Sequence, residues 1–151
     1  MRGPVKGMAR CQSPLEIKLG RAFALIGVFE PRLDGDEYSI IGAWPFAGLV
    51  LHAQPQICGI HPDFALIPES GSWRVAIEVD GHAYHERTKE QADRDRKRDR
   101  DMLREDVVML RFTGSEVWRG ADDCAREALS VAVGMMAKEY ARTAYREPAY
   151  A

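Results

Sequence analysis

The sequence is poor in cysteine and has neither a long apolar run nor a secretory signal, and each absence excludes a class of protein. Three cysteines lie far apart among the 151 residues, with no Cys-x-x-Cys pair. This spacing argues against a disulfide framework or a zinc knot and favours reduced thiols. No apolar run approaches the roughly 20 residues of a membrane helix, and residues 1–6 lack the apolar core of a signal peptide. We therefore expect a cytoplasmic protein with no membrane partner.

An excess of positive charge is also missing. The formal net charge is -2, whereas a protein that binds polyanions without specificity is usually clearly basic. If the chain handles nucleic acid, its positive charge must be local, and some acidic residues must serve another purpose, such as holding a metal ion. The length is that of one domain, which we place at residues 13–144, between flexible tails at residues 1–12 and 145–151.

The patterns of apolar residues and turn residues predict an α/β sandwich with a small mixed sheet and helices on both faces. Ser13, followed by Pro14 and then by Glu16 three residues after the cap, is typical of a helix start, and apolar residues at helical spacing extend this helix to about residue 26. The other predicted elements are strands at 49–54, 60–67 and 73–79, a charged helix at 86–105, a strand at 107–112 and a helix at about 121–144. A long connection from residue 30 to residue 48 has room for one short strand at 38–41.

Two carboxylates follow one another closely at the end of the third of these strands. Glu78 and Asp80 are two residues apart and therefore point to the same side of a strand, while Val79 packs on the opposite face and offers its carbonyl at the edge. Asp63 precedes a short turn, so a hairpin can make it the cross-strand neighbour of Glu78, although the register cannot be read from the sequence. Carboxylates that converge repel each other unless a cation or a proton intervenes. Oxygen ligands with room for water suit Mg²⁺ or Mn²⁺.

Each part of this cluster also has a plainer interpretation. Glu78 and Asp80 could be the polar end of a strand that runs into a glycine turn. His82 and His85 could be a zinc pair, although no third ligand stands at a suitable spacing; a neutral histidine next to a metal is also a suitable base for water. Glu16 fits a helix capping box as well as it fits a carboxylate aimed at an active site.

The charged helix leaves a similar choice open. Such a run usually forms a solvated helix with ion pairs between successive turns. Met102 and Leu103 are expected in the core, and stepping back from them by helical turns leads to Asp99, Arg96 and Asp95. Either the helix projects beyond the core or these three residues line a polar site.

Taken together, these residues resemble the PD-(D/E)xK nuclease superfamily, whose members have a restriction-endonuclease-like fold. Pro62-Asp63 followed by Glu78-Val79-Asp80 is similar to the motif of that superfamily. The linked segment over residues 62–117, which adds the charged helix and the strand that follows it, is more similar to very-short-patch-repair-type endonucleases and their uncharacterised relatives. The resemblance covers about residues 13–135.

The resemblance implies a DNA endonuclease that depends on Mg²⁺ or Mn²⁺. Asp63 would be the central metal ligand, Glu78 the second ligand, and the Val79 carbonyl would complete the protein contribution. Asp80 stands where the superfamily has a lysine, and a carboxylate cannot give the attacked phosphate a positive charge. It would instead bind metal or orient a histidine, as in relatives that also lack the lysine, and His85 would be the base that activates water.

The resemblance also assigns residues around this centre. Glu16 would match a helix carboxylate that many superfamily members aim at the site. Arg96 and Arg98 would contact or neutralise the phosphate, and His82 would be a second candidate base or a nucleic-acid contact. Asp106 stands where the relatives usually have glycine, a position at which aspartate tolerates a left-handed helix end.

Two questions stay open on these residues. The first is whether the missing lysine marks lost catalysis, in which case the same fold would serve as an inactive nucleic-acid-binding or protein-interaction module. A zinc hydrolase built on the histidines is a more distant alternative. The second question is the partner: the residues do not separate DNA from RNA, and they leave room for a homodimer, which many enzymes of this fold form in order to cut both strands.

Overall fold

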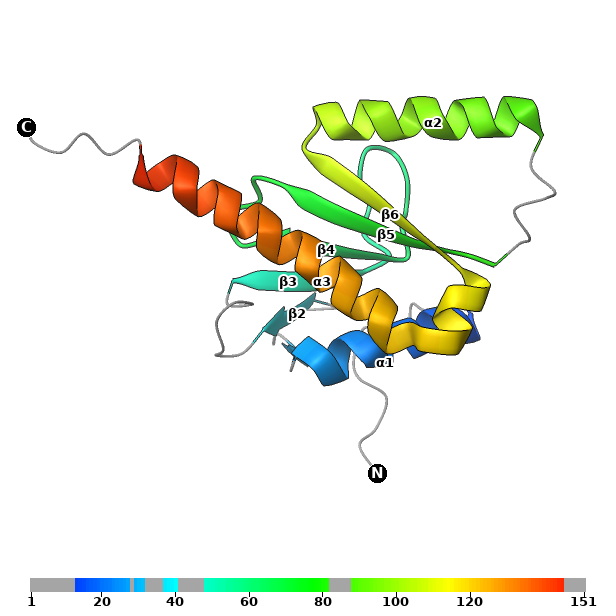
Figure 1. Ribbon diagram of the computed structural model, residues 1–151, viewed down its shortest axis with the longest axis horizontal. Coiled ribbons are helices and arrows are strands. Elements are labelled where there is room, and N and C mark those ends of the chain that lie inside the picture. Colours follow the sequence, from blue (N-terminus) through cyan, green and yellow to red (C-terminus); the bar gives the residue numbers. More distant parts are fainter. Residues whose placement is uncertain (1–12, 28, 32–36, 41–47, 82–87, 146–151) are drawn as a thin grey trace, which may run out of the picture.

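The computed structural model describes residues 13–27, 29–31, 37–40, 48–81 and 88–145. These residues form a mixed six-stranded sheet and three helices (Figure 1). In chain order the elements are α1 (Pro14–Gly27), β1 (Phe29–Pro31), β2 (Glu37–Ile40), β3 (Leu49–Ala53), β4 (Phe64–Pro68), β5 (Arg74–Asp80), α2 (Lys89–Arg104), β6 (Val107–Thr113) and α3 (Gly114–Ala144). The strands lie side by side in sequence order, and every neighbouring pair is antiparallel except β5 and β6, which are parallel.

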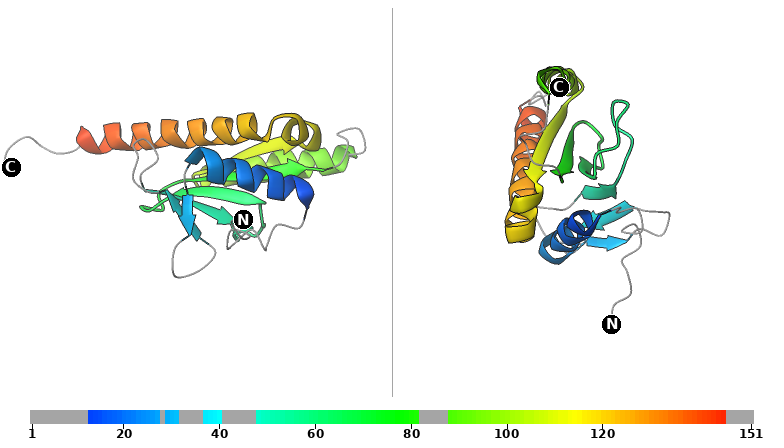
Figure 2. Two further views of the ribbon diagram at one scale, coloured as in Figure 1. Left: turned by 90° about the horizontal axis from the view of Figure 1, so that it is seen from below. Right: turned by 90° about the vertical axis from the view of Figure 1, so that its right-hand side faces the viewer.

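Helices cover both faces of the sheet, as the sequence predicts. Helices α1 and α3 pack on one face, where Phe23 and Leu129 join the larger core together with side chains of β3, β4 and β5. The other face carries a smaller core in which Met102 of α2 and Ile57 of the loop between β3 and β4 are buried. Figure 2 shows this division, with α1 and α3 on one side of the sheet and that loop on the other. Alternation along β5 supplies both cores, because successive side chains of a strand point to opposite faces.

The parallel pair of β5 and β6 positions the polar end of the sheet. Parallel neighbours need a crossover connection, and α2 lies in that connection between the two strands. Helix α2 begins with a capping box in which Thr88 accepts from the backbone of Gln91 and the Gln91 side chain accepts in return. The resulting register places Glu78 beside Arg111 and Asp80 beside Thr113.

Two predicted boundaries are wrong, each for a local reason. The strand predicted at 60–67 begins only at Phe64, because Ile57 and Ile60 exchange two backbone hydrogen bonds (2.9 and 3.0 Å) and close a tight turn there. The last helix begins at Gly114 instead of about residue 121, since Thr113 is its N-cap in a capping box with Glu116. The segment that reads as a turn is thus a helix start, and the helix is kinked at Gly120.

Other expectations are confirmed or refined. The connection before β3 holds two short strands rather than one. The charged helix spans 89–104 rather than 86–105. Met102 is buried as expected, but Leu103 is 60% exposed and does not join the core. Asp106 adopts the left-handed conformation with a φ of 57°, as the sequence suggests for this position. None of the helices in the described ranges is long and apolar enough to cross a membrane.

Candidate functional site

The hairpin of β4 and β5 brings Asp63 opposite Glu78. The two strands are antiparallel, with Phe64 opposite Ile77, and one further step along this register pairs Asp63 with Glu78. Asp63 stands just before β4 begins, and its Oδ2 accepts a hydrogen bond of 2.7 Å from the backbone N–H of Val79. The Asp63 carboxylate is therefore anchored to the end of β5.

The charge state of Asp63 depends on its burial and on three other acidic residues. Burial raises the pKa of Asp63 to about 6 from its ordinary value of 3.8, although the Val79 N–H favours the charged form. The negative charges of Glu16, Glu78 and Asp80 raise it further. The charges of the other three acidic residues that the sequence assigns to the site therefore act on Asp63. These three residues come from α1 and from β5.

Glu16 reaches the site from α1. It is 8% exposed and is the one buried charged residue of the described part of the chain. Its Oε2 accepts a hydrogen bond of 3.2 Å from Nε2 of Gln54, and the backbone N–H of Gln54 donates to the carbonyl of Asp63 at 2.9 Å. Ser13 Oγ accepts from the Glu16 N–H at 3.2 Å, so the expected cap is also present. Gln54 therefore connects α1 to the Asp63 segment, a role that the sequence does not predict.

Glu78 is held by two arginines. Its Oε2 lies 3.2 Å from Arg111 Nε and 3.5 Å from Arg98 Nη2. Arg111 also donates two hydrogen bonds, of 2.7 and 2.8 Å, to the two carboxylate oxygens of Asp99. Burial lowers the pKa of Arg111, but the bonds and charges of Asp99 and Glu78 outweigh it and raise that pKa above its ordinary value. The Arg111 guanidinium is thus a permanent, oriented positive charge beside a candidate metal ligand.

The charged helix divides its residues between this network and the solvent. Asp99 and Arg98 line the polar site, and Asp95 lies 3.7 Å from Arg98. Arg96 points elsewhere: it pairs with Asp93 at 3.6 Å, and its side chain is 72% exposed. The structure therefore brings Arg98 to the candidate site and leaves Arg96 on the solvent-facing side of α2.

Arg111 is a second residue of this site, after Gln54, that sequence reasoning missed. It is the one charged residue in an otherwise apolar stretch over residues 107–112. A charge in a buried strand needs a partner, which was the available signal. The identity of that partner depends on the register between β5 and β6, which no local pattern gives.

The oxygen donors of this site are of the type that binds a hard divalent ion, but the described side chains do not converge on a common point. Asp63, Glu78 and the Val79 carbonyl offer the oxygen ligands that Mg²⁺ and Mn²⁺ prefer. Among the residues that the structure describes, no three acidic, histidine or cysteine side chains are arranged to hold a metal. Glu78 faces its arginines and would have to exchange them for the ion. His82 and His85, the predicted second candidate and base, lie outside the described residues.

Comparison with protein-family models, with curated proteins and with solved structures gives no match for this chain. The interpretation of the site therefore depends on the chemistry of its own residues.

Proposed function

We propose that the protein is a metal-dependent DNA endonuclease of the restriction-endonuclease-like fold. It would hydrolyse phosphodiester bonds with a metal ion bound by Asp63 and Glu78. The observation that carries this proposal is the position of Asp63 at the end of the hairpin, where its carboxylate accepts a hydrogen bond from the Val79 N–H and the register places it opposite Glu78. Burial and three acidic residues raise the pKa of Asp63 to about 6. Such crowding costs stability in the folded protein. A cation bound between the carboxylates would remove that cost, so the arrangement supports a metal site at the end of the hairpin.

The residues of this site have separate roles in the proposed reaction. Asp63, fixed by the Val79 N–H, and Glu78 hold the ion together with the Val79 carbonyl. Bound Mg²⁺ or Mn²⁺ would neutralise charge on the phosphate and lower the pKa of a water molecule. Asp80 adds negative charge at the end of β5. His85, on its resemblance to the histidine of the repair-type relatives, takes the proton of the attacking water.

The arginines offer the positive charge that a lysine would otherwise supply. Asp80 occupies the position of the superfamily lysine, so β5 brings no cation to the phosphate. Arg111 lies on the neighbouring strand, beside Glu78, and Asp99 fixes its guanidinium. Arg98 lies on the same side of Glu78. If Glu78 held a metal ion, Nε of Arg111 and Nη2 of Arg98 would be released from it and could donate to phosphate oxygens, for which arginine geometry is well suited.

The test is cleavage of plasmid DNA and of nicked or mismatched duplexes in the presence of Mg²⁺ or Mn²⁺. Asp63→Asn and Glu78→Gln keep the shape of each side chain and remove its charge, and each should lower the rate by about 100-fold or more. Glu127→Gln, an exposed change on α3, is the matched control and should leave the rate unchanged. Cleavage that survives both substitutions, or no cleavage of any nucleic acid by the native protein, would contradict the proposal.

A second function has its own supporting observation. Glu78 is neutralised by Arg111 and Arg98 in the described structure, and the missing lysine fits a chain that binds nucleic acid without cutting it. This alternative predicts DNA binding that weakens with salt and needs no metal. A calorimetric titration with Mn²⁺ separates the two functions: heat that is lost in Asp63→Asn supports the nuclease, and no heat in the native protein supports the binding module.

A further inference from the structure

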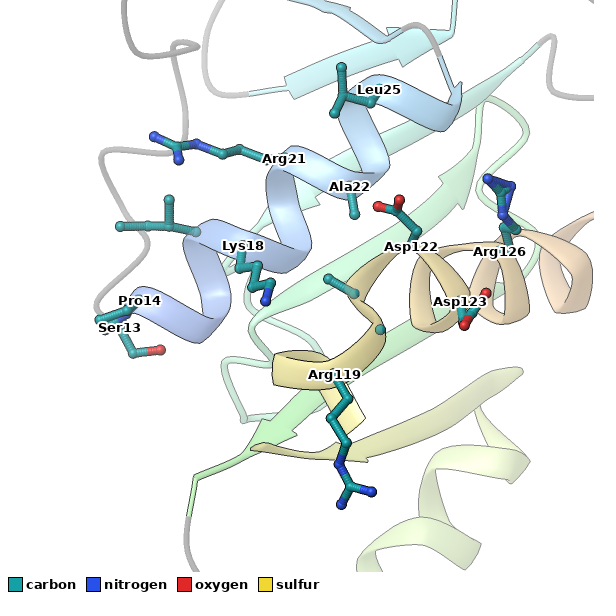
Figure 3. Close-up of a pocket in the computed structure, with 13 residues that line it drawn as sticks. Ser13, Pro14, Lys18, Arg21, Ala22, Leu25, Arg119, Asp122, Asp123 and Arg126 are labelled. Carbon is teal, nitrogen blue, oxygen red and sulfur yellow. The ribbon is translucent and has the colours of Figure 1, made fainter. Parts of the chain in front are cut away.

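A groove outside the candidate catalytic site runs between α1 and the start of α3. It has a volume of about 1020 Å³ (Figure 3). Four basic and two acidic side chains line it: Lys18, Arg21, Arg119, Arg126, Asp122 and Asp123. Figure 3 shows Lys18 reaching from α1 toward α3, while Arg21 and Arg119 extend outward at the margins of the groove. The groove therefore has a local positive charge in a protein whose overall charge is slightly negative.

An exposed tryptophan stands next to this groove. Trp118 is 67% exposed although it is one of the largest apolar side chains of the protein. Lys18 holds it from one side: Nζ lies over the indole, 4.5 Å from the ring centroid, and donates a hydrogen bond of 2.6 Å to the Trp118 carbonyl. The ring is thus oriented before any ligand binds, with most of its surface in solvent. An oriented aromatic ring beside basic side chains is the arrangement used by proteins that bind single-stranded nucleic acid.

The groove also lies close to the end of β5. A methyl group placed on Gly114, the first residue of α3, would stand 3.4 Å from the carbonyl oxygen of Asp80 and 3.0 Å from Leu15 of α1. Trp118 follows Gly114 by about one helical turn, a rise of roughly 5–6 Å. The start of α3, which carries Trp118, therefore lies beside the end of β5, which carries Glu78 and Asp80.

We propose that Trp118, Lys18 and the arginines of this groove form a binding surface for an unpaired nucleic-acid strand. The indole stacks on one base, and Lys18, Arg21 and Arg119 contact phosphates. This deepens the proposed nuclease function, because it assigns a substrate with an unpaired segment next to the scissile bond. A base inside a duplex is already stacked on both sides, so it cannot use the indole.

Charge argues against the other occupants of the groove. Residues 1–12, which precede α1, contain three basic residues and no acidic one, so they have no attraction for a basic groove. An acidic polypeptide can pair with the positive charges, but its carboxylate side chains have no ring that could stack on the exposed indole. A nucleic-acid strand matches both features.

The experiment measures binding of fluorescein-labelled single-stranded and duplex oligonucleotides by anisotropy, over a range of salt concentrations. All variants carry Asp63→Asn as well, so that cleavage does not disturb the measurement. Trp118→Ala should weaken single-strand binding about ten-fold and duplex binding much less, and Trp118→Phe should retain most of the affinity. Lys18→Gln should reduce the salt dependence by about one phosphate contact. Tyr140→Ala and Lys138→Gln, exposed changes farther along α3, are the controls and should leave both unchanged.

Equal single-strand affinity in Trp118→Ala and Tyr140→Ala would overturn this proposal. It would also be overturned if poly-glutamate displaced the labelled single strand as well as an unlabelled single strand of the same total charge does. These outcomes do not depend on whether the native protein cuts DNA. If the native protein fails to cut but Trp118→Ala loses single-strand binding, the nuclease proposal fails and the binding surface stands. If the native protein cuts and Trp118→Ala binds normally, the reverse holds.

Discussion

Replacing Asp63 by asparagine should make the metal-free protein more stable, although it removes the central residue of the candidate site. Asparagine is neutral at all accessible pH values, and its Oδ1 can still accept the hydrogen bond from the Val79 N–H. The native carboxyl has a pKa of about 6 in the folded protein, above its ordinary 3.8. The folded state therefore favours the protonated form, and ionising Asp63 destabilises the fold.

The sign and size of the effect follow from this shift. Below its unfolded-state pKa of about 4, Asp63 is protonated in both states and does not lower the free energy of unfolding. The protonated form, which the folded state favours, is lost as the pH rises through about 6, and the free energy of unfolding is then lower. A shift of about two units corresponds to ~3 kcal/mol. Asp63 is partly exposed, and solvent screening reduces this to about 1–2 kcal/mol. The free energy of unfolding of Asp63→Asn should thus exceed that of the native protein by this amount near neutral and alkaline pH, and equal it in acid.

Urea unfolding followed by tryptophan fluorescence, at a series of pH values with and without Mg²⁺, measures both parts of the prediction. An ion that binds only the folded state stabilises it by mass action, by about 1.4 kcal/mol at ten times its dissociation constant. Mg²⁺ should therefore stabilise the native protein above pH 6 and leave Asp63→Asn unchanged. The reasoning is refuted if Asp63→Asn is no more stable than the native protein at alkaline pH, or if Mg²⁺ stabilises both equally.

Three further predictions concern the groups around the site. Arg111→Met leaves two partly buried carboxylates without their guanidinium and should destabilise the protein by about 2–4 kcal/mol in urea unfolding, with Arg111→Lys in between; a loss below the error of the measurement would show that the network is not structural. Thr113→Ala removes the N-cap of α3 and should cost about 1 kcal/mol, against little change for Thr143→Ala, a threonine in the last turn of the same helix. Glu16→Gln should lower the pKa of Asp63 in an NMR titration of its carboxyl carbon, and an unchanged pKa would place Glu16 outside the cluster.

The hairpin that carries the site could be predicted because local rules determine it. An apolar run at residues 75–77 and a short turn rich in polar residues before it indicate an antiparallel pair. The position of Asp63 opposite Glu78 follows from the observed register. The burial of Met102 and the direction of Asp99 could likewise be obtained by counting helical turns. The same counting placed Leu103 in the core and Arg96 on the polar stripe, whereas both are exposed in the structure.

Long-range pairing could not be predicted in the same way. The partner of Glu78 on β6 depends on the length and the path of the whole crossover, and a shift of one residue would have replaced Arg111 by an apolar neighbour. The start of α3 was missed for another reason. A threonine, a glycine and a serine in succession are typical of a turn. The hydrogen bond that the Thr113 backbone N–H donates to Glu116 Oε2 identifies them as a helix N-terminus.

On the proposed nuclease function, the Glu78–Arg111 pair offers a substitute for the lysine that the PD-(D/E)xK superfamily has at the position of Asp80. In the metal-free fold the two arginines offset the charge of Glu78, while Asp63 remains crowded by the other carboxylates and keeps a high pKa. A cation held by Asp63 and Glu78 would relieve this crowding and would release Nε of Arg111, whose guanidinium Asp99 would continue to orient. A positive charge at position 80 would then not be needed, because Arg111 of β6 would supply one at the same edge of the sheet. If the protein is a nuclease, Arg111 on the neighbouring strand would take the place of that lysine.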